Sequence, residues 1–269
     1  MADMLDRSHR TLETVARACE VLRVLERLDG AGVTEVAEEL DISKSSAHAY
    51  LATLHEQRLV VQRGNEYRLS LRFFDLGQHV KQHHALFEHG REQVEELARR
   101  SGEYAHLMCQ QHGLEKNIHK VAGDQAIGEH YQQIKKQQSD YLHITASGKA
   151  VLAQLPESEA RQIVDHYGLE RKTDETITEP EVLFEELEAI RDRGYAVNDE
   201  EEITGIRAVA APIQTVSSES TGAISVSGPK RRLTGEFYEE TLPALVMEQA
   251  NVVEANVNME ATSQEIAES

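Results

Sequence analysis

The stretch from Asp41 to Leu69, DISKSSAHAYLATLHEQRLVVQRGNEYRL, decides the fold of the N-terminal part of the chain. Ser43 is a good N-cap, and the apolar residues after it recur at steps of three and four, which predicts a helix. The buried stripe of this helix is expected to be Ala47, Tyr50, Leu51 and Leu54. Two short apolar runs, Leu59–Val61 and Tyr67–Leu69, flank a Gly64-Asn65 turn and predict a β-hairpin.

Upstream of this stretch the sequence predicts two more helices. Apolar residues between Leu12 and Leu28 form an amphipathic pattern that Asp29-Gly30 ends, and Val33 to Leu40 makes a short second helix. Helix, short helix, tight turn, helix and hairpin, in this order, are typical of a winged helix-turn-helix, which we assign to residues 1–70. A small helical core with an incidental hairpin is the alternative interpretation.

The charge of this segment indicates contact with an anion. The 269 residues include 28 Lys and Arg against 47 Asp and Glu, a formal net charge of −19. Residues 43–70 nevertheless carry four basic side chains and only two acidic ones. In so acidic a chain, this local excess predicts a surface that contacts an anion.

The remaining composition excludes several classes of protein. Hydrophobic residues make up 40% of the chain, enough for a core, but no apolar run approaches the ~20 residues of a membrane helix. The first residues contain no apolar signal region, and the only cysteines, Cys19 and Cys109, are far apart. We therefore expect a cytoplasmic protein with no membrane partner, rather than a secreted disulfide scaffold or a zinc finger.

The acid excess is spread along the chain and accompanied by 19 Arg but only 9 Lys. Such a surface suits a cytosol of molar salt, which predicts a halophilic, archaeal source. An ordinary acidic protein of a mesophile is the alternative.

Periodicity divides the rest of the chain into a linker helix over residues 71–90, a second domain over 91–257 and a disordered tail over 258–269. In the second domain we expect helices over 92–100, 148–155, 157–167, 181–192 and 234–249, and strands over 103–109, 114–121, 206–214 and 222–227. Interleaved helices and strands give the chain the α+β class.

Chemistry-bearing residues do not assemble into a recognisable catalytic or metal motif. Cys109 has His106 and His112 nearby but lies on an apolar strand, where an inert thiol is expected. His79 and His83 have metal-ligand spacing without a complete ligand set, and Glu200–Glu202 is expected to be a solvated loop. We expect no enzyme, no cofactor and no metal.

A pair of serines predicts a small-molecule pocket in the second domain. Strand alternation puts Ser225 and Ser227 on one sheet face, opposite Ile224 and Val226. Two hydroxyls near the helix that starts around Gly148 could bind a carboxylate, because helix N-termini favour anions. The alternative is that the two serines satisfy each other or backbone groups.

Four motifs resemble the IclR family of transcriptional regulators, in the family's order. They are Ser43–His48 (SKSSAH), Leu142–Ala150 (LHITASGKA), Gly194–Ile213 (GYAVNDEEEITGIRAVAAPI) and Ala223–Gly228 (AISVSG). The resemblance covers nearly the whole chain. It implies a winged helix joined by a linker helix to a GAF-like effector-binding domain, and a small carboxylate from carbon catabolism as effector.

The resemblance also implies the residues of the effector site. They are Ala146, Ser147, Asn198, Ile206, Ala208, Ser225 and Ser227. Many members have an acidic residue where this chain has Asn198, and a cysteine where it has Ala208.

For DNA, the expected contacts lie on the third helix and the hairpin. They are Lys44, Ser45, Ser46, His48, Arg63 and Arg68. Ser45 and Ser46 are expected to face base edges, whereas Lys44, His48 and Arg63 are expected near phosphates or the minor groove. Many relatives have Arg in place of the outward Ala49.

The function that follows is a regulator that binds a palindromic double-stranded operator as a homodimer or tetramer. One alternative is a metabolite sensor that acts through a protein partner and has lost DNA binding. A second alternative is an enzyme built on the C-terminal domain.

Overall fold

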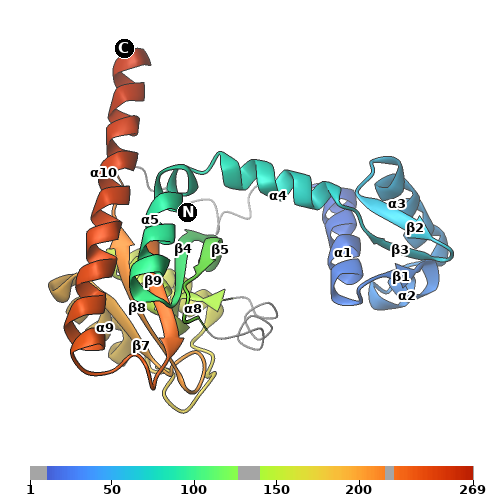
Figure 1. Ribbon diagram of the computed structural model, residues 1–269. Coiled ribbons are helices and arrows are strands. Elements are labelled where there is room, and N and C mark those ends of the chain that lie inside the picture. The colour runs from blue at the N-terminus through green and yellow to red at the C-terminus, as the bar shows by residue number, and fades with distance from the viewer. Residues whose placement is uncertain (1–10, 127–139, 216–220, 269) are drawn as a thin grey trace. The chain divides into compact units, whose positions relative to one another are not determined.

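The computed structural model describes residues 11–126, 140–215 and 221–268. The chain divides into two compact units, with the division between Gln82 and His83 (Figure 1). Residues 1–10 of the expected first domain, and Ser269 of the expected tail, lie outside the described residues. No helix in the described part of the chain is long and apolar enough to cross a membrane.

The N-terminal unit has the predicted winged helix-turn-helix architecture. Its elements are α1 (Glu13–Arg27), β1 (Ala31–Gly32), α2 (Val33–Glu39), α3 (Lys44–Glu56), β2 (Val60–Arg63), β3 (Glu66–Leu69) and α4 (Arg72–Gln82). The three strands form an antiparallel sheet in the order β1-β3-β2. β1 was not predicted, because two residues are too short to show a period. Val21 and Leu25 of α1 pack with Ala47 and Leu51 of α3 in one core.

The C-terminal unit is built on a six-stranded antiparallel sheet in the order β6-β5-β4-β9-β8-β7. The strands are β4 (Tyr104–Gln111), β5 (Leu114–Ala122), β6 (Asp140–Tyr141), β7 (Ala196–Asp199), β8 (Ile206–Ile213) and β9 (Gly222–Pro229). This mixture of helices with an antiparallel sheet confirms the α+β class. β6 and β7 were not predicted, since both are short and lie at the two edges of the sheet.

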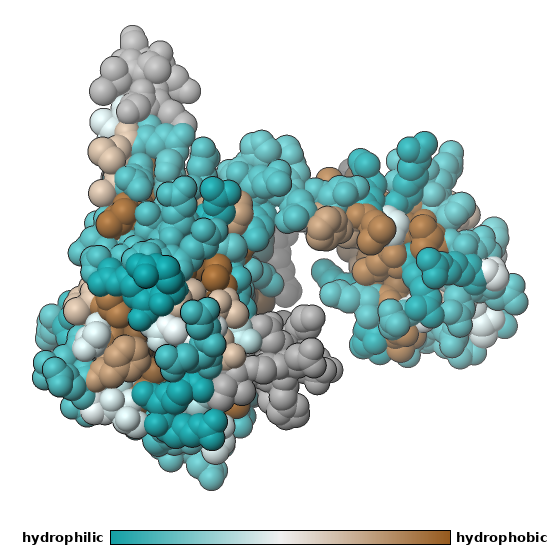
Figure 2. Space-filling model, in the orientation of Figure 1, coloured by the Kyte–Doolittle hydropathy of each residue, from teal (hydrophilic) through white to brown (hydrophobic). Residues whose placement is uncertain are grey.

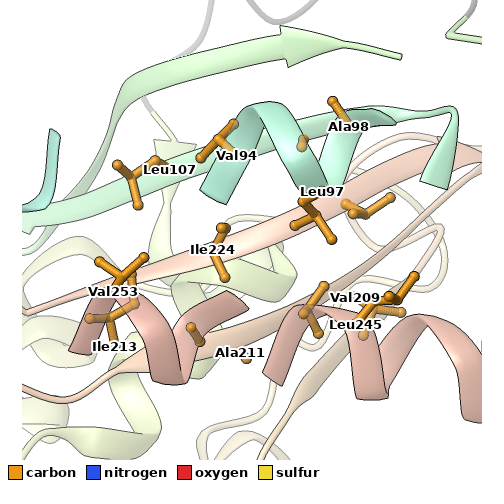
Figure 3. Close-up of a cluster of buried hydrophobic side chains, with 14 of the residues drawn as sticks. Val94, Leu97, Ala98, Leu107, Val209, Ala211, Ile213, Ile224, Leu245 and Val253 are labelled. Carbon is orange, nitrogen blue, oxygen red and sulfur yellow. The ribbon is translucent and has the colours of Figure 1, made fainter. Parts of the chain in front are cut away.

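Helices cover both faces of this sheet. They are α5 (Ala85–Ser101), η2 (Leu142–Ile144), α7 (Ala146–Gln154), α8 (Glu157–Tyr167), α9 (Pro180–Arg193), η4 (Phe237–Thr241) and α10 (Leu242–Glu268). On one face, Val94 and Leu97 of α5 and Val253 of α10 pack against Leu107 and Ile224 of the sheet (Figure 3). On the other face, a second core joins α7, α8 and α9 to the sheet. α7, which carries the predicted effector residues Ala146 and Ser147, therefore lies against the sheet face away from α5.

Two expected boundaries in the chain are wrong. The second domain was expected to begin after Gly90, but α5 runs through Gly90, and a Cβ there would lie 2.8 Å from Leu107 Cδ2. This glycine therefore permits close packing instead of ending a helix. The expected linker helix over 71–90 is correspondingly two helices, since α4 ends at Gln82 and α5 begins at Ala85.

The tail over 258–269 was expected to be disordered, yet α10 continues to Glu268. Two features explain the difference. No Gly or Pro interrupts the chain after Pro243, and Val253 and Val257 are buried against the sheet, which extends the helix beyond the predicted end at Gln249.

Candidate functional site

The helix α3 presents one face to the core and the opposite face to solvent. The Ser46 N–H donates to Ser43 Oγ at 3.1 Å, so Ser43 is the N-cap, as predicted. Ala47, Leu51 and Leu54 are buried, and Tyr50 of the predicted stripe is half-buried. Leu51 and Leu54 thus fix the orientation of α3, and this leaves a solvent-facing surface.

The exposed face of α3 and the wing, the hairpin formed by β2 and β3, hold most of the predicted DNA contacts. Lys44, Ser45, His48 and Arg63 are exposed, and Ser46 and Arg68 are half-buried. The exposed face also includes Ala49 and Ala52, whose short side chains leave the α3 backbone open to close approach. Because these groups lie within one folded unit, they can meet one duplex together.

Three of the predicted contacts already have partners within the protein. Ser43 Oγ lies 2.9 Å from Ser45 Oγ and 2.8 Å from Ser46 Oγ, so these hydroxyls form one small network at the start of α3. Arg68 forms ion pairs with Asp29 at 3.5 Å and with Glu66 at 3.3 Å. A phosphate would compete with these two carboxylates for Arg68, whereas Arg63 and Lys44 lie exposed at the surface.

The second candidate site is a cavity between α7 and the sheet. It is lined by His106, Met108, Glu115, Thr145, Ala146, Ser147, Glu202, Ala208, Ser225 and Ser227. Five of the seven predicted effector residues are among them, the exceptions being Asn198 and Ile206. The free volume of the cavity is about 10 Å³, which is about what one water molecule needs. A larger molecule would therefore have to widen it.

Asn198 supports the site from behind instead of lining the cavity. Its side-chain amide donates to the Ile144 carbonyl at 2.5 Å, and its Oδ1 accepts the Glu201 N–H at 3.1 Å. Asn198 therefore ties β7 to the turn before α7. Ile206, at the start of β8, is half-buried opposite Pro229 at the end of β9.

His106 orients Ser227, one of the two predicted serines. From the sequence, His106 was expected only as a possible partner of Cys109. On β4, His106 pairs in register with Ser225 of β9, and its Nε2 lies 2.9 Å from Ser227 Oγ. The Asn117 amide contacts His106 Nδ1 at 3.0 Å, which favours a proton on Nε2 and donation to Ser227. Strand alternation on β4 could have revealed His106 and Met108, had the pairing with β9 been known.

Glu115 changes the chemistry expected at the start of α7. This side chain of β5 is 4% exposed, and both of its oxygens accept hydrogen bonds, one from the Thr145 hydroxyl and one from Ser147 Oγ at 2.9 Å. Thr145 also caps α7 by accepting the Gly148 N–H at 2.8 Å. The start of α7, which was predicted to help bind an effector carboxylate, therefore already contacts a carboxyl group of the protein itself.

The acidic run Glu200–Glu202 is not the solvated loop that was expected. Lys149, which is 1% exposed, donates to both oxygens of Glu201 at 2.6 and 2.7 Å, and Glu202 lines the cavity. Burial raises the pKa of Glu201, and the Lys149 ammonium opposes this rise. The Thr176 hydroxyl donates to the Glu201 carbonyl at 2.6 Å. These contacts fix the loop after β7 against α7.

Cys109 does not have the environment of a nucleophile. It is buried on the α5 face of β4, and burial raises the pKa of its thiol to about 11. His106 lies on the opposite face of the same strand, where it lines the cavity. The thiolate needed for catalysis is therefore strongly disfavoured, in agreement with the inert thiol that was expected.

Comparison with known proteins connects both sites to one family. Residues 78–254 match the family described as bacterial transcriptional regulator IclR, C-terminal, and residues 14–64 match the IclR helix-turn-helix domain. The chain is 33% identical over 249 residues to a protein of Halobacterium salinarum named Probable HTH-type transcriptional regulator ArcR, covering 92% of this chain and 95% of that one.

Two further relatives agree. The HTH-type transcriptional regulator KdgR of Escherichia coli is 29% identical over 243 residues, covering 90% of this chain and 91% of KdgR. The crystal structure of the Thermotoga maritima IclR has a TM-score of 0.70 and 29% identity, covering 92% of this chain and 100% of that structure. The similarity therefore extends over both units.

Proposed function

The chain belongs to the IclR family of DNA-binding transcriptional regulators, and from this premise we propose that a small carboxylate effector controls its binding to a palindromic operator. It is a regulator and not an enzyme, since both matched families and the relatives named above are regulators. The observation that carries the proposal is the joint presence of an outward-facing α3 in one unit and a polar cavity in the other.

In this proposal α3 enters the major groove and the wing lies beside it. Lys44 and Arg63 contact phosphates, which fixes the position of the protein without reading sequence. Ser45 and Ser46 exchange their bonds with Ser43 for bonds to base edges, and His48 lies near the backbone. Arg68 joins them only after leaving Asp29 and Glu66.

Three single variants test the DNA contacts. Lys44→Ala and Arg63→Ala should weaken binding at every sequence and each lower the slope of log K against log salt by about 0.9. Ser45→Ala should instead reduce the ratio of the affinity for the operator to the affinity for mismatched sequences. Arg99→Ala, an exposed arginine of α5, is the charge-matched control. The measurement is a salt series of fluorescence anisotropy titrations on the promoter of the protein's own gene.

The same titrations separate regulator and sensor. A protein that has lost DNA binding would show only weak, sequence-independent binding that none of the three substitutions changes. Such a result would favour the metabolite sensor that acts through a protein partner.

The effector carboxylate is proposed to bind at Ser225 and Ser227. His106 donates toward Ser227, which leaves the Ser227 hydroxyl proton directed away from His106. Met108, long and flexible, lines the same cavity and is suited to move when a ligand widens it. The assignment to carbon catabolism rests on the family resemblance.

The double variant Ser225→Ala/Ser227→Ala should abolish the effector response while operator affinity stays unchanged, because the two sites lie in different units. Calorimetry with candidate carboxylates measures the first quantity and anisotropy the second. Genome-wide mapping of binding sites with and without candidate carbon sources would supply those candidates. Equal effector affinity in the wild type and the double variant would remove the cavity from the proposal.

Self-association of the N-terminal unit is proposed from its exposed apolar side chains (Figure 2). Leu12 and Val15 near the start of α1 are 67% and 58% exposed, and Phe74 and Val80 of α4 are 62% and 65% exposed. Large apolar side chains that are exposed to this extent are typical of an interface between protein chains. The proposed occupant is a second copy, since a palindromic operator needs two α3 helices. Phe74→Glu with Val80→Glu should give a monomer by light scattering.

The setting is proposed to be the cytoplasm of a halophilic archaeon. A DNA-binding regulator acts where the genome is, and the net charge of −19 suits a salt-rich solvent. The similarity to the Halobacterium salinarum protein supports this setting.

A further inference from the structure

The end of α3 is firmly tied to Arg58, the residue that follows its C-cap Gln57. Arg58 has a left-handed backbone, with φ 61°. Its N–H donates to the His55 carbonyl at 2.9 Å, and the Leu59 N–H donates to the Leu54 carbonyl at 2.9 Å. These two bonds form the Schellman motif that closes many helices. The carbonyl of Arg58 is therefore fixed relative to α3.

One hydroxyl joins this carbonyl to the start of α4. Ser70, the residue after β3, donates its hydroxyl proton to the Arg58 carbonyl at 2.6 Å, and its oxygen accepts the Arg72 N–H at 3.2 Å. A serine hydroxyl has one proton and two lone pairs, so it makes both bonds at once. The Ser70 N–H also donates to the Leu59 carbonyl at 3.0 Å. Ser70 is therefore bonded both to the segment that follows α3 and to the first residue of α4.

Packing does little to fix the direction of α4. The described part of the chain buries no residue of this helix, and within it only Phe73 and Lys81 are half-buried. Phe74 and Val80 are 62% and 65% exposed, and they belong to the surface proposed for self-association. Because apolar contacts to α4 are few, we expect the bonds of the Ser70 hydroxyl to set the angle between α4 and α3.

We propose that Ser70 is a positioning residue that sets the separation of the two α3 helices in a dimer and thereby selects the spacing of the operator half-sites. The proposal rests on the proposed function, since it assumes that two copies associate through α1 and α4 on a palindromic operator. In such a dimer the two α4 helices are fixed to each other, and Ser70 fixes each α3 to its own α4. The separation of the two α3 helices then determines the half-site spacing.

An operator with altered spacing strains the contacts of Ser70. One base pair added between the half-sites moves one of them by roughly 3.4 Å along the duplex and turns it by roughly 35°. To follow that half-site, one α3 must turn relative to its α4, which breaks a Ser70 bond to Arg58 or Arg72. Without the hydroxyl this bond is already absent, so the penalty on altered spacing should be smaller. One hydrogen bond corresponds to roughly a twofold to tenfold change in affinity.

Operator duplexes of different spacing test the proposal with the full-length protein. Footprinting on the promoter of the protein's own gene first locates the operator, and base pairs are then added or removed between its half-sites. Fluorescence anisotropy measures the spacing ratio, which is the affinity for native spacing divided by the affinity for altered spacing. In Ser70→Ala the spacing ratio should fall roughly twofold to tenfold, while the affinity for a duplex with one half-site stays unchanged.

Three further variants control this measurement. Ser70→Thr keeps the hydroxyl and should keep the wild-type spacing ratio. Ser158→Ala, at an exposed serine of α8, is the matched control and should also keep it. A far-UV spectrum and a thermal melt establish that each variant remains folded. If Ser70→Ala does not fold, Ser70→Cys replaces it, because its thiol is a weak donor and acceptor and should also lower the spacing ratio.

An unchanged spacing ratio in Ser70→Ala would overturn the role of Ser70, as would a wild type that binds every spacing equally. A loss of half-site affinity in Ser70→Ala, or a lowered spacing ratio in Ser70→Thr, would also overturn it, because Ser70 would then only stabilise the fold. The proposed function fails differently. A wild type that binds no operator specifically, or that is a monomer by light scattering, would contradict the proposed function, whereas a dimer with an unchanged spacing ratio contradicts only the role of Ser70.

Discussion

Lys149 is a single buried cation that fixes α7 against the loop after β7. Its ammonium contacts both oxygens of Glu201, and both side chains are almost fully removed from water. We predict that Lys149→Met lowers the free energy of unfolding by roughly 3–5 kcal/mol, because it leaves Glu201 buried without a cation. Urea denaturation measures this loss.

The double variant Lys149→Met/Glu201→Leu is the informative control for that prediction. It removes both charges, so most of the lost stability should return. If the double variant were as unstable as the single one, packing around Lys149, and not the ion pair, would explain the loss.

His143 supplies a prediction about pH. It is buried, its Nε2–H donates to the Glu170 carbonyl at 3.1 Å, and burial lowers its pKa below the ordinary 6.5. As the pH falls through about 6.5, His143 is therefore protonated in the unfolded chain but stays neutral in the folded protein. Stability contributed by the neutral ring is present above pH 6.5 and is lost as the pH falls, by up to about 1.4 kcal/mol per pH unit.

Comparison of variants isolates this contribution. In His143→Gln the decline in unfolding free energy between about pH 6.5 and 5 should be shallower than in the wild type. His166→Gln, an exposed histidine of α8, should keep the wild-type slope. Identical slopes in all three proteins would show that other groups cause the acid sensitivity.

Among the elements, α7 depends on a close approach to the preceding turn. A Cβ on Gly148 would lie 2.2 Å from the Leu142 carbonyl oxygen and 2.6 Å from Leu142 Cα, both of them backbone atoms. We predict that Gly148→Ala destabilises the C-terminal unit by about 1–3 kcal/mol or more, since the backbone must shift.

Gly77 is the natural comparison for Gly148. It lies within α4, and its Cβ would meet nothing within 4 Å. Gly77→Ala should therefore be neutral or stabilising by up to about 1 kcal/mol, because alanine has the higher helix propensity. Thermal melts of both variants provide the measurement, and a neutral Gly148→Ala would contradict the packing argument.

How far the elements follow from sequence depends on their periodicity. α3, the wing and α8 have complete amphipathic or alternating patterns, and the structure confirms them. β6 and β7 are short edge strands whose pairing depends on distant partners, so no local pattern reveals them. The helix end predicted at Gly90 is wrong, because a single sequence does not distinguish a glycine that ends a helix from a glycine that allows close packing, here against Leu107.

The cavity was only partly predictable for the same physical reason. Ser225 and Ser227 lie two residues apart on one strand, so alternation places them together. Glu115 reaches the cavity from β5, which is separated from β9 by a whole strand. There Glu115 accepts hydrogen bonds from the Thr145 and Ser147 hydroxyls. A single sequence contains no signal for contacts between residues about thirty positions apart.

For the whole molecule, the charge predicts a strong dependence of stability on salt. Nineteen net negative charges repel one another in the folded state. The Debye length falls from ~10 Å at 0.1 M to ~3 Å at 1 M, so molar salt removes most of that repulsion. We predict partial unfolding or loss of oligomers below a few tenths molar KCl, and a melting temperature that still rises near ~2 M.

A neutral homologue melted in the same KCl series controls for the general effect of salt on apolar burial. The difference between the two melting curves is the contribution of the acid excess. A melting temperature that stays flat between about 0.1 and 2 M KCl would contradict the proposed halophilic setting.

β4 connects the cavity on one face of the sheet with α5 on the other face. His106 and Met108 face the cavity, while the alternate residue Leu107 faces α5, whose Gly90 admits it closely. The backbone of β4 thus carries side chains of the polar cavity on one face and of the apolar core on the other. A shift of the strand on one face therefore displaces the side chains on the other face as well. If an effector displaces Met108 as proposed, we expect the shift of β4 to reach α5, which begins three residues after α4 ends. Hydrogen exchange along α5 should therefore record the arrival of a molecule that α5 never touches.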